Sequence, residues 1–223
     1  MALVTRATLK LFLGLASTDT AQDTALDMHI DQCSARIETF CKRIFAAADY
    51  TSYLVGNGDR FLPLPQGPIN SVASVNEDYY AFWGQAPNAF ASSTLLTAGT
   101  DYAIVKDQPG GISKCALLYR INTVWPKPLT YVGGTISPQN LDGVGNLKIV
   151  FNAGYATIPY DIQQACCFLV AAVKRIAKLG VPTTSEGWED YNYSLQQAAA
   201  DAIGGLPPDT LATLMRYRYT SVG

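Results

Sequence analysis

The sequence is poor in charged residues. Asp, Glu, Lys and Arg make up 15% of its 223 residues, whereas about a quarter is usual for a soluble domain. Hydrophobic residues stand at 48%, close to the usual share, which argues against a largely disordered chain. Because charge is depleted where protein surfaces meet, the deficit favours a chain that other subunits partly cover.

The chain also lacks an excess of positive charge. Its formal net charge is −2, whereas a protein that grips phosphates over a wide face is usually basic. Tight binding of nucleic acid is therefore disfavoured. Weak contact with DNA that passes the protein remains open.

Residues that bind metals or cross-link chains are scarce. The only histidine is His29, and no CxxC pair occurs, so we expect no structural zinc site and no cofactor. The odd number of cysteines and the absence of a secretory leader predict free thiols in a reducing cytoplasm. No apolar run is long enough to span a bilayer, and we expect no membrane partner. The cysteines are Cys33, Cys41, Cys115, Cys166 and Cys167.

Motifs for catalysis are missing as well. A nucleophile needs a nearby base, usually histidine, and His29 lies within a predicted helix, where a structural role is favoured. The Gly-Gly pairs have neither the GxGxxG nor the GxxxxGK[ST] context. Paired acids could act together, so a small hydrolase built on Glu77 or Asp78 remains an alternative. The other acids near one another are Glu186, Glu189 and Asp190. We expect no enzyme.

Helical periodicity marks the two ends of the chain. Thr5 can cap a helix that runs to Leu13 before Gly14. Longer helices are predicted over Gln22–Ile44 and Pro159–Leu179, and a last one after Pro207-Pro208. A polar, alanine-rich segment covers Leu195–Ile203. The apolar stripes of the two long helices comprise Leu26, Ile30, Cys33, Ile37, Phe40 and Ile44, and Ile162, Cys166, Leu169, Val173 and Ile176.

The middle of the chain has the composition of β structure. Between Tyr50 and about Phe151, Gly, Pro, Thr, Val and Tyr are frequent and short segments alternate with period two. Asn57-Gly58 predicts a tight hairpin turn between the first two strands. Loops are expected over Ala81–Thr100 and Lys127–Gly145. The predicted strands are Tyr53–Val55, Arg60–Leu62, Ile69–Val75, Asp101–Val105, Ala116–Ile121 and Asn146–Phe151.

These patterns predict an α+β fold: an α-helical bundle formed by the N- and C-terminal segments, residues 1–49 and 154–223, with an inserted all-β subdomain over residues 50–153. The two long helices must pack on each other, because neither can bury its stripe alone.

Aromatic residues gather in the expected loop after Glu77. They could form a platform for a sugar or a base, although a loop packed onto the sheet or a neighbouring subunit is favoured. A β-rich carbohydrate-binding or tail-associated binding module is therefore the main alternative function. The residues are Tyr79, Tyr80, Phe82, Trp83 and Phe90.

Several segments, taken in order, resemble the phage head–tail connector (adaptor) family, the ring proteins similar to the HK97 and SPP1 connectors. Leu3–Leu15 is similar to the opening short helix of that family, and Ile30–Arg43 to its long helix. Tyr50–Tyr53, Gly56–Gly58, Leu62–Pro65 and Pro68–Val75 follow. The most specific match is Val150–Cys166, a strand, a Gly-Tyr turn and a helix that starts at proline. Leu211–Gly223 resembles the arginine-containing C-terminal arm.

The resemblance implies a structural virion protein in the neck, made in the host cytoplasm. Its copies would form a closed ring, usually twelve-fold, that binds the portal protein and joins the DNA-filled capsid to the tail. DNA would pass through the lumen, and a stopper or tail-completion protein would be a further partner. A role as such a stopper is the nearest alternative within this class.

Two sets of residues are candidates for these contacts. We expect the C-terminal residues to bind the portal and to become ordered only there, because Arg and Tyr are favoured interface anchors; deleting Leu211–Gly223 would then leave a folded subunit that does not attach. We expect the two long helices to supply the contact between subunits. The portal-binding candidates are Leu211, Leu214, Arg216, Tyr217, Arg218 and Tyr219, and the subunit-contact candidates are Ile30, Ile37, Ile162 and Leu169.

Overall fold

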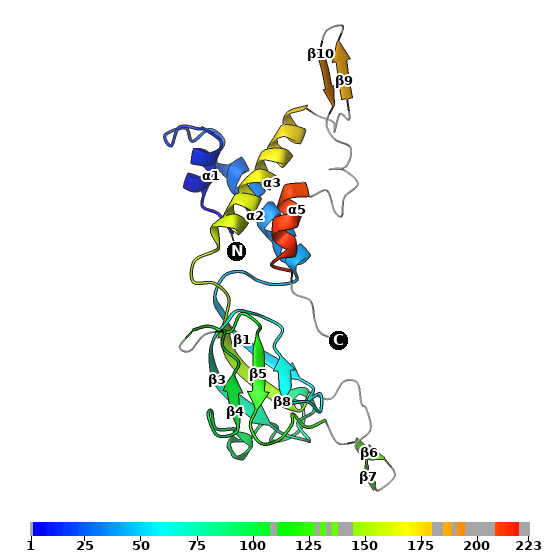
Figure 1. The fold of residues 1–223 in the computed structure, drawn as a ribbon. Coiled ribbons are helices and arrows are strands. Elements are labelled where there is room, and N and C mark those ends of the chain that lie inside the picture. Colours follow the sequence, from blue (N-terminus) through cyan, green and yellow to red (C-terminus); the bar gives the residue numbers. More distant parts are fainter. Residues whose placement is uncertain are drawn as a thin grey trace. The chain divides into compact units, whose positions relative to one another are not determined.

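The computed structural model describes residues 2–107, 111–127, 130–132, 135–137, 145–179, 185–188, 191–194 and 208–218. It contains helices and antiparallel sheets, which confirms the mixed α+β class. The chain divides into two compact units (Figure 1). The first, here the helical unit, comprises Met1–Ala46 and Thr157–Thr220, and the second, here the β unit, is built on Ala47–Ala156.

The helical unit begins with α1 (Arg6–Phe12) and α2 (Asp23–Cys41). Thr5 caps α1 as predicted, since its Oγ1 accepts a 3.2 Å hydrogen bond from the amide of Thr8. The helix predicted over Gln22–Ile44 is confirmed but ends three residues early. Lys42 there adopts a left-handed conformation with φ of 53°, which stops the helix.

The C-terminal part of the helical unit contributes α3 (Tyr160–Leu179) and α5 (Pro208–Met215). α3 packs against α2, where Ser34 Oγ and Cys166 Sγ lie 3.8 Å apart. α5 packs against both, and the Cys41 thiol donates to the carbonyl oxygen of Leu214 at 3.7 Å. The predicted contact between the two long helices is therefore confirmed.

The β unit contains two antiparallel three-stranded sheets. One has the order β1 (Ala48–Leu54), β8 (Leu147–Ala153), β3 (Ile69–Glu77). The other has the order β2 (Phe61–Pro63), β5 (Leu117–Arg120), β4 (Tyr102–Ile104). Side chains of β8 alternate between buried and half-buried, as expected for a strand with one face on a core. That core includes Leu64, Val75, Leu118, Trp125, Leu147, Ile149 and Phe151.

The hairpin predicted around Asn57-Gly58 is wrong. β1 pairs with β8 and β2 pairs with β5, so the two strands that flank this turn do not pair with each other. The reason is that the turn is hydrogen-bonded elsewhere. The Gly56 amide donates to Asn146 Oδ1 at 2.8 Å, and the Gly58 amide donates to the Trp125 carbonyl at 2.8 Å.

Two further hairpins lie where no strands were expected. β6 (Thr130–Val132) pairs with β7 (Thr135–Ser137), and β9 (Ser185–Trp188) pairs with β10 (Tyr191–Ser194). Strands of three or four residues are too short to display a period-two pattern, so no such pattern indicated them. The predicted loop over Ala81–Thr100 holds the short 3₁₀ turns η1 (Phe82–Gly84) and η2 (Ser92–Thr94). Leu195–Ile203 lies outside the described residues.

Among the described helices, none is both long enough and apolar enough to cross a membrane.

Candidate assembly surfaces

The predicted subunit-contact residues lie in the core of the helical unit. Ile30, Ile37, Ile162 and Leu169 are each at most 2% exposed. Full burial of such a side chain contributes about 1.5–3 kcal/mol, so these four residues stabilise the packing of α2 against α3. Their side chains do not reach the surface of the helical unit.

An exposed apolar patch lies on α1 and α3 instead. The rings of Phe12 and Phe168 meet edge to face, with centroids 5.3 Å apart, and both are exposed. Leu11 beside them is 82% exposed. We call Leu11, Phe12 and Phe168 the α1–α3 patch. It joins residues far apart in sequence, so no local pattern pointed to it.

The outward face of α3 continues this uncharged surface. Tyr160, Gln164 and Phe168 are all exposed and follow one another at intervals of four, which places them on one face. A helix that faces water usually carries charges there. The missing charge at these positions is the signal from which the sequence could have indicated a covered face.

α1 is held against α2 by a charged cluster. The Lys10 ammonium group is largely buried and lies 2.5 Å from Asp23 Oδ1, and it also donates to the Asp19 carbonyl at 2.6 Å. Arg6 bridges Asp23 and Asp27, at 2.5 and 3.2 Å. Lys10 lowers the pKa of Asp23, and Arg6 acts in the same direction. The cluster fixes the helix that presents Leu11 and Phe12.

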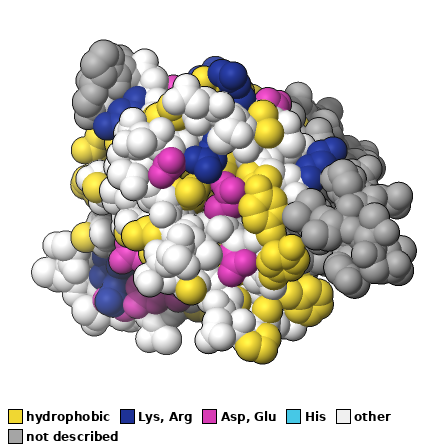
Figure 2. All heavy atoms as spheres, turned by 90° about the horizontal axis from the view of Figure 1, so that it is seen from below, with side chains coloured by type: hydrophobic (Ala, Val, Ile, Leu, Met, Phe, Trp, Pro, Cys, Tyr) yellow, Lys and Arg dark blue, Asp and Glu magenta, His cyan; other side chains and the backbone are white. Residues whose placement is uncertain are grey.

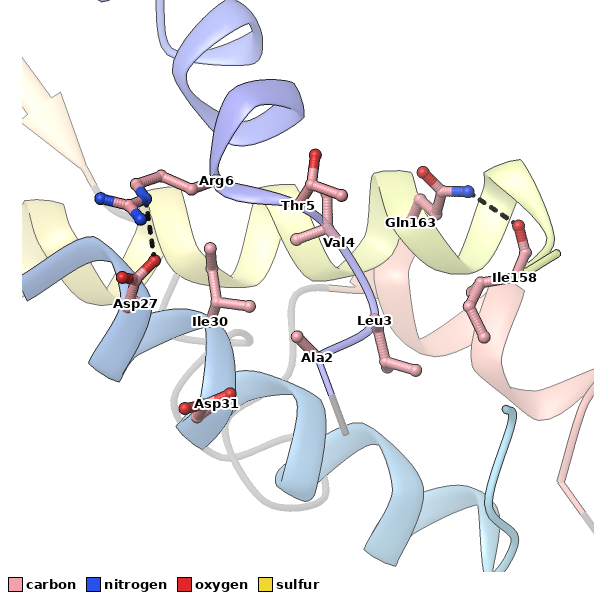
Figure 3. A pocket seen from close by; sticks show the side chains of 10 residues that line it. All are labelled: Ala2, Leu3, Val4, Thr5, Arg6, Asp27, Ile30, Asp31, Ile158 and Gln163. Atoms are coloured by element: carbon pink, nitrogen blue, oxygen red, sulfur yellow. Dashed lines mark hydrogen bonds and ion pairs between the residues drawn. The ribbon is translucent and has the colours of Figure 1, made fainter. Parts of the chain in front are cut away.

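A hollow of about 560 Å³ lies beside this cluster. The N-terminal segment runs between α2 and α3, with Arg6 and Asp27 at one end and Gln163 and Ile158 at the other (Figure 3). The Gln163 amide donates to the Ile158 carbonyl at 2.8 Å, and Arg6 pairs with Asp27. At each end of the hollow, the polar groups thus bind a group beside them. The lining holds neither histidine nor cysteine.

The C-terminal candidates fall into two groups. Leu214 is buried against α2 and Leu211 is half-buried. The Tyr217 hydroxyl donates to Asp161 Oδ2 at 2.7 Å, and the Arg218 guanidinium lies 5.5 Å from the ring centroid of Phe40. The expectation that these residues become ordered only on the portal is therefore corrected for Tyr217 and Arg218, because they already have partners within the helical unit.

Arg216 remains at the surface, next to the exposed Met215, which was not among the candidates. Together they present a cation and an apolar side chain at the end of α5. Tyr219 lies outside the described residues.

The carboxylates considered for a hydrolase, Glu77 and Asp78, accept hydrogen bonds from groups of the same chain. Glu77 Oε2 accepts a 3.1 Å hydrogen bond from Arg120, and burial raises the pKa of Glu77 although Arg120 opposes the shift. Asp78 accepts from the amides of Tyr80 and Phe90, at 3.0 and 2.9 Å. Glu189 and Asp190 lie outside the described residues, and for Glu186 only the backbone is described.

The cysteines are free, and all but Cys115 are buried. Burial raises the pKa of Cys33 and of Cys41 to about 11 and that of Cys166 to about 12. These thiols therefore stay protonated and act as small core side chains. His29 is half-buried on α2, and within the described ranges no three His, Cys, Asp or Glu residues gather as a metal site would require.

The aromatic loop after β3 is partly packed, as expected. Trp83 lies against the backbone of Gly145, and its amide donates to the Gly145 carbonyl at 3.1 Å. The rings of Phe90 and Tyr53 lie 5.7 Å apart. Tyr80 and Phe82, by contrast, are 64% and 51% exposed.

Figure 2 shows how charged side chains are scattered on one face of the molecule, where hydrophobic side chains gather in a band.

No protein-family model matches the chain, and comparison with curated proteins finds no match. Solved structures do match. A chain described as "Neck of empty GTA particle computed with C6 symmetry" is 17% identical, with a TM-score of 0.56, over 99% of this chain and 91% of that one. A chain from "Virion of native gene transfer agent (GTA) particle" has 17% identity and a TM-score of 0.54 over the same shares. The protein therefore has the fold of these chains.

Proposed function

We propose that this protein is a structural subunit of the neck of a phage-like particle, an adaptor that forms a ring, binds the portal protein and joins the DNA-filled capsid to the tail. One observation carries the proposal: the fold extends over 99% of the chain and matches a chain from the neck of a gene transfer agent particle. At 17% identity this likeness concerns the fold, so the role in the neck is our inference.

The architecture suits such a role. In the proposal, residues 1–49 and 154–223 form the helical connector core and residues 50–153 an inserted β subdomain. A ring needs two different surfaces on each copy that bind each other with a rotation that closes. The α1–α3 patch supplies one apolar surface with few charges. Twelve copies would enclose a lumen for DNA, and the net charge of −2 keeps contact with phosphates weak.

The end of α5 is the proposed portal contact. Leu214 and Tyr217 anchor it to the helical unit, and Arg216 and Met215 remain exposed to bind. Arginine and exposed apolar groups are favoured at the centres of protein interfaces. The work of the protein is thus geometric, without a covalent step.

A carbohydrate-binding module remains the rival from another class, and the exposure of Tyr80 and Phe82 favours it. Against it, the nearest carboxylate that could bind a sugar hydroxyl, Asp78, has both oxygens occupied by backbone amides. Trp83, a natural stacking residue, is packed on Gly145. Glycan binding that disappears in a folded Phe82→Ala variant would support the rival.

Electron microscopy of the protein mixed with its portal tests the proposal. A ring of this protein docked coaxially on the portal is the expected result. A protein that stays separate from the portal at micromolar concentration, and forms no ring there, would overturn it. A coaxial ring that requires another neck protein between it and the portal would instead favour the stopper role.

A further inference from the structure

The β unit carries an exposed aromatic pair, Tyr80 and Phe82, in a strained and well-anchored loop. Phe82, Trp83, Asn88 and Phe90 all have positive φ, at 43°, 56°, 60° and 58°. For bulky residues this conformation is rare and unfavourable, and it persists only where surrounding contacts enforce it. Four such residues lie in one short loop, so contacts around the loop must hold its conformation.

The anchors are on both sides of the exposed pair. Asp78 accepts hydrogen bonds from the amides of Tyr80 and Phe90 and so ties the two ends of the loop together. Trp83 fills the space beside Gly145, where a Cβ atom would approach its ring to 2.4 Å. With these inner contacts fixed, Tyr80 and Phe82 are held outward. Rigid exposed aromatics are typical anchors of protein interfaces, since little entropy is lost on binding.

The segment that carries this pair contains no charged residue. From Tyr79 to Thr100 the sequence contains no Asp, Glu, Lys or Arg. A phosphate backbone would need cations there, and a charged protein surface would find no complement. The partner surface that fits this pair is an apolar recess in a protein.

Such a recess exists on the same unit. A pocket of about 300 Å³ is lined by Val72 of β3, by Tyr102, Ala103 and Ile104 of β4, and by Ala98, Gly99 and Lys106. Most of its lining is small or apolar. The turn that forms its wall is held by hydrogen bonds from Gly99 to the Tyr102 carbonyl and from Thr97 to Asp101. Lys106 is the one charged residue of the lining, and a cation beside an aromatic ring is attractive.

The aromatic pair and the pocket lie against different strands of the β unit. η1, which contains Phe82, contacts β1 and β8, and Phe90 meets Tyr53 of β1. The pocket is lined by β3 and β4. β3 is the edge of its sheet opposite to β1, and β4 is an edge strand of the other sheet, so a side-by-side arrangement of β units would bring the pair of one copy toward the pocket of the next. Two different surfaces that bind head to tail are what a ring contact needs.

We propose that Phe82, flanked by Tyr80, inserts into the pocket around Ala98 and Ala103 of a second copy of this chain, so that successive β units bind each other around the ring. This inference rests on the proposed ring. The occupant is a second copy because the chain itself supplies both matching surfaces.

Disulfide trapping tests it on the full chain. In a Cys115→Ser background, which removes the exposed native thiol, Phe82→Cys is combined with Ala98→Cys and the protein is oxidised with and without portal. Successive copies then become linked, and a non-reducing gel shows a ladder that rises beyond the dimer. Each single cysteine variant stops at the dimer. A matched pair, Phe61→Cys with Ala98→Cys, uses an aromatic position on β2 of similar exposure, 45% against 51% for Phe82, and gives no ladder.

The outcomes separate the two proposals. Rings on the portal without a ladder would overturn the contact between β units and leave the neck function standing. A ladder without rings on the portal would support the contact and count against the neck function. As a second measurement, Phe82→Ala and the pocket-filling Ala98→Trp should each weaken association about tenfold or more, whereas Phe61→Ala should not. Unchanged association in both variants would contradict the proposal.

Discussion

The hydroxyl of Tyr217 donates a 2.7 Å hydrogen bond to Oδ2 of Asp161, so the end of α5 is tied to the first turn of α3. The ring of Tyr217 also meets that of Phe45, with centroids 5.9 Å apart. These contacts explain why this part of the C-terminal segment is ordered without a portal. They also give the segment a role in stability that can be separated from binding.

Replacing Tyr217 by Phe removes the hydroxyl and keeps the ring. Because the lost hydrogen bond ends on a carboxylate, we expect the free energy of unfolding to fall by about 1–2 kcal/mol. Chemical denaturation of the purified protein measures the difference. Tyr160→Phe is the control, since Tyr160 lies one residue before Asp161 and is exposed. Equal stabilities of the two variants would show that the hydrogen bond contributes little.

One truncation and one substitution separate folding from portal binding. Removing Leu211–Gly223 takes away the buried Leu214, and loss of such a side chain costs about 2–5 kcal/mol. We therefore no longer expect this truncation to leave a stable subunit. Arg216→Glu in the full chain should fold normally and reduce co-sedimentation with the portal. Lys42→Glu, which inverts an exposed charge just after α2, is the control. Unreduced co-sedimentation of Arg216→Glu would remove Arg216 from the contact.

Arg120 should be the most sensitive charged residue of the β unit. Its side chain is 9% exposed, donates to Glu77 and to the Asp101 carbonyl, and lies over the ring of the fully buried Trp125. Arg120→Ala leaves the largely buried Glu77 carboxylate without its cationic partner, and we expect a loss of about 3 kcal/mol. Denaturation followed by tryptophan fluorescence measures it. Arg60→Ala, at an exposed arginine that binds the Tyr119 hydroxyl, should cost about 0.5 kcal/mol or less.

The pair of Lys10 and Asp23 predicts a dependence of stability on pH. The pKa of Asp23 is lowered in the folded state from its ordinary 3.8. A lowered pKa means that the ionised pair stabilises the folded protein above about pH 4, and that this contribution is lost as the pH falls through the folded pKa. Asp23→Asn should thus be less stable than the native protein at neutral pH.

The difference between Asp23→Asn and the native protein should shrink as the pH falls below about 4. Thermal unfolding across a pH series measures it. Asp31→Asn, at an exposed position on the same helix, should show no such trend. A difference for Asp23→Asn that stays constant at all pH values would contradict the prediction.

The sequence predicted most where a pattern was long. The stripe that contains Ile30 and Ile37 extends over several turns, and it correctly indicated a helix packed against another. The same stripe does not indicate what covers it, because an apolar face has the same composition whether its own chain or another subunit covers it. The α1–α3 patch escaped notice because Phe12 and Phe168 meet only after folding.

Strand pairing was the least predictable feature. Asn57-Gly58 has the composition of a hairpin turn, but local composition carries no information on hydrogen bonds to residues far along the chain. The strand partner of β1 is β8, and that of β2 is β5. The glycine beside this turn that packing requires is Gly56, because it lies against the backbone of Pro126, far along the chain.

Gly56 faces the backbone of Pro126 so closely that a Cβ atom would lie 1.9 Å from the Pro126 carbonyl oxygen. That oxygen also accepts a 2.7 Å hydrogen bond from the amide of the fully buried Asn146, whose Oδ1 accepts from the Gly56 amide. A methyl group at Gly56 must therefore separate both backbones and break the bridge. We expect Gly56→Ala to destabilise the protein by about 3 kcal/mol, as overpacking at a backbone contact does.

Gly99→Ala is the matched control for Gly56→Ala. Gly99 has φ of 80°, but a Cβ atom there would meet nothing within 4 Å, so only the cost of the left-handed conformation applies, about 1–2 kcal/mol. Chemical denaturation of both variants compares the two effects. If crowding against Pro126 is the reason for glycine at position 56, the Gly56 variant is the less stable one. The reverse order would mean that the chain between β1 and β2 can move away from Pro126 at little cost, and that Asn146 does not hold the two segments together.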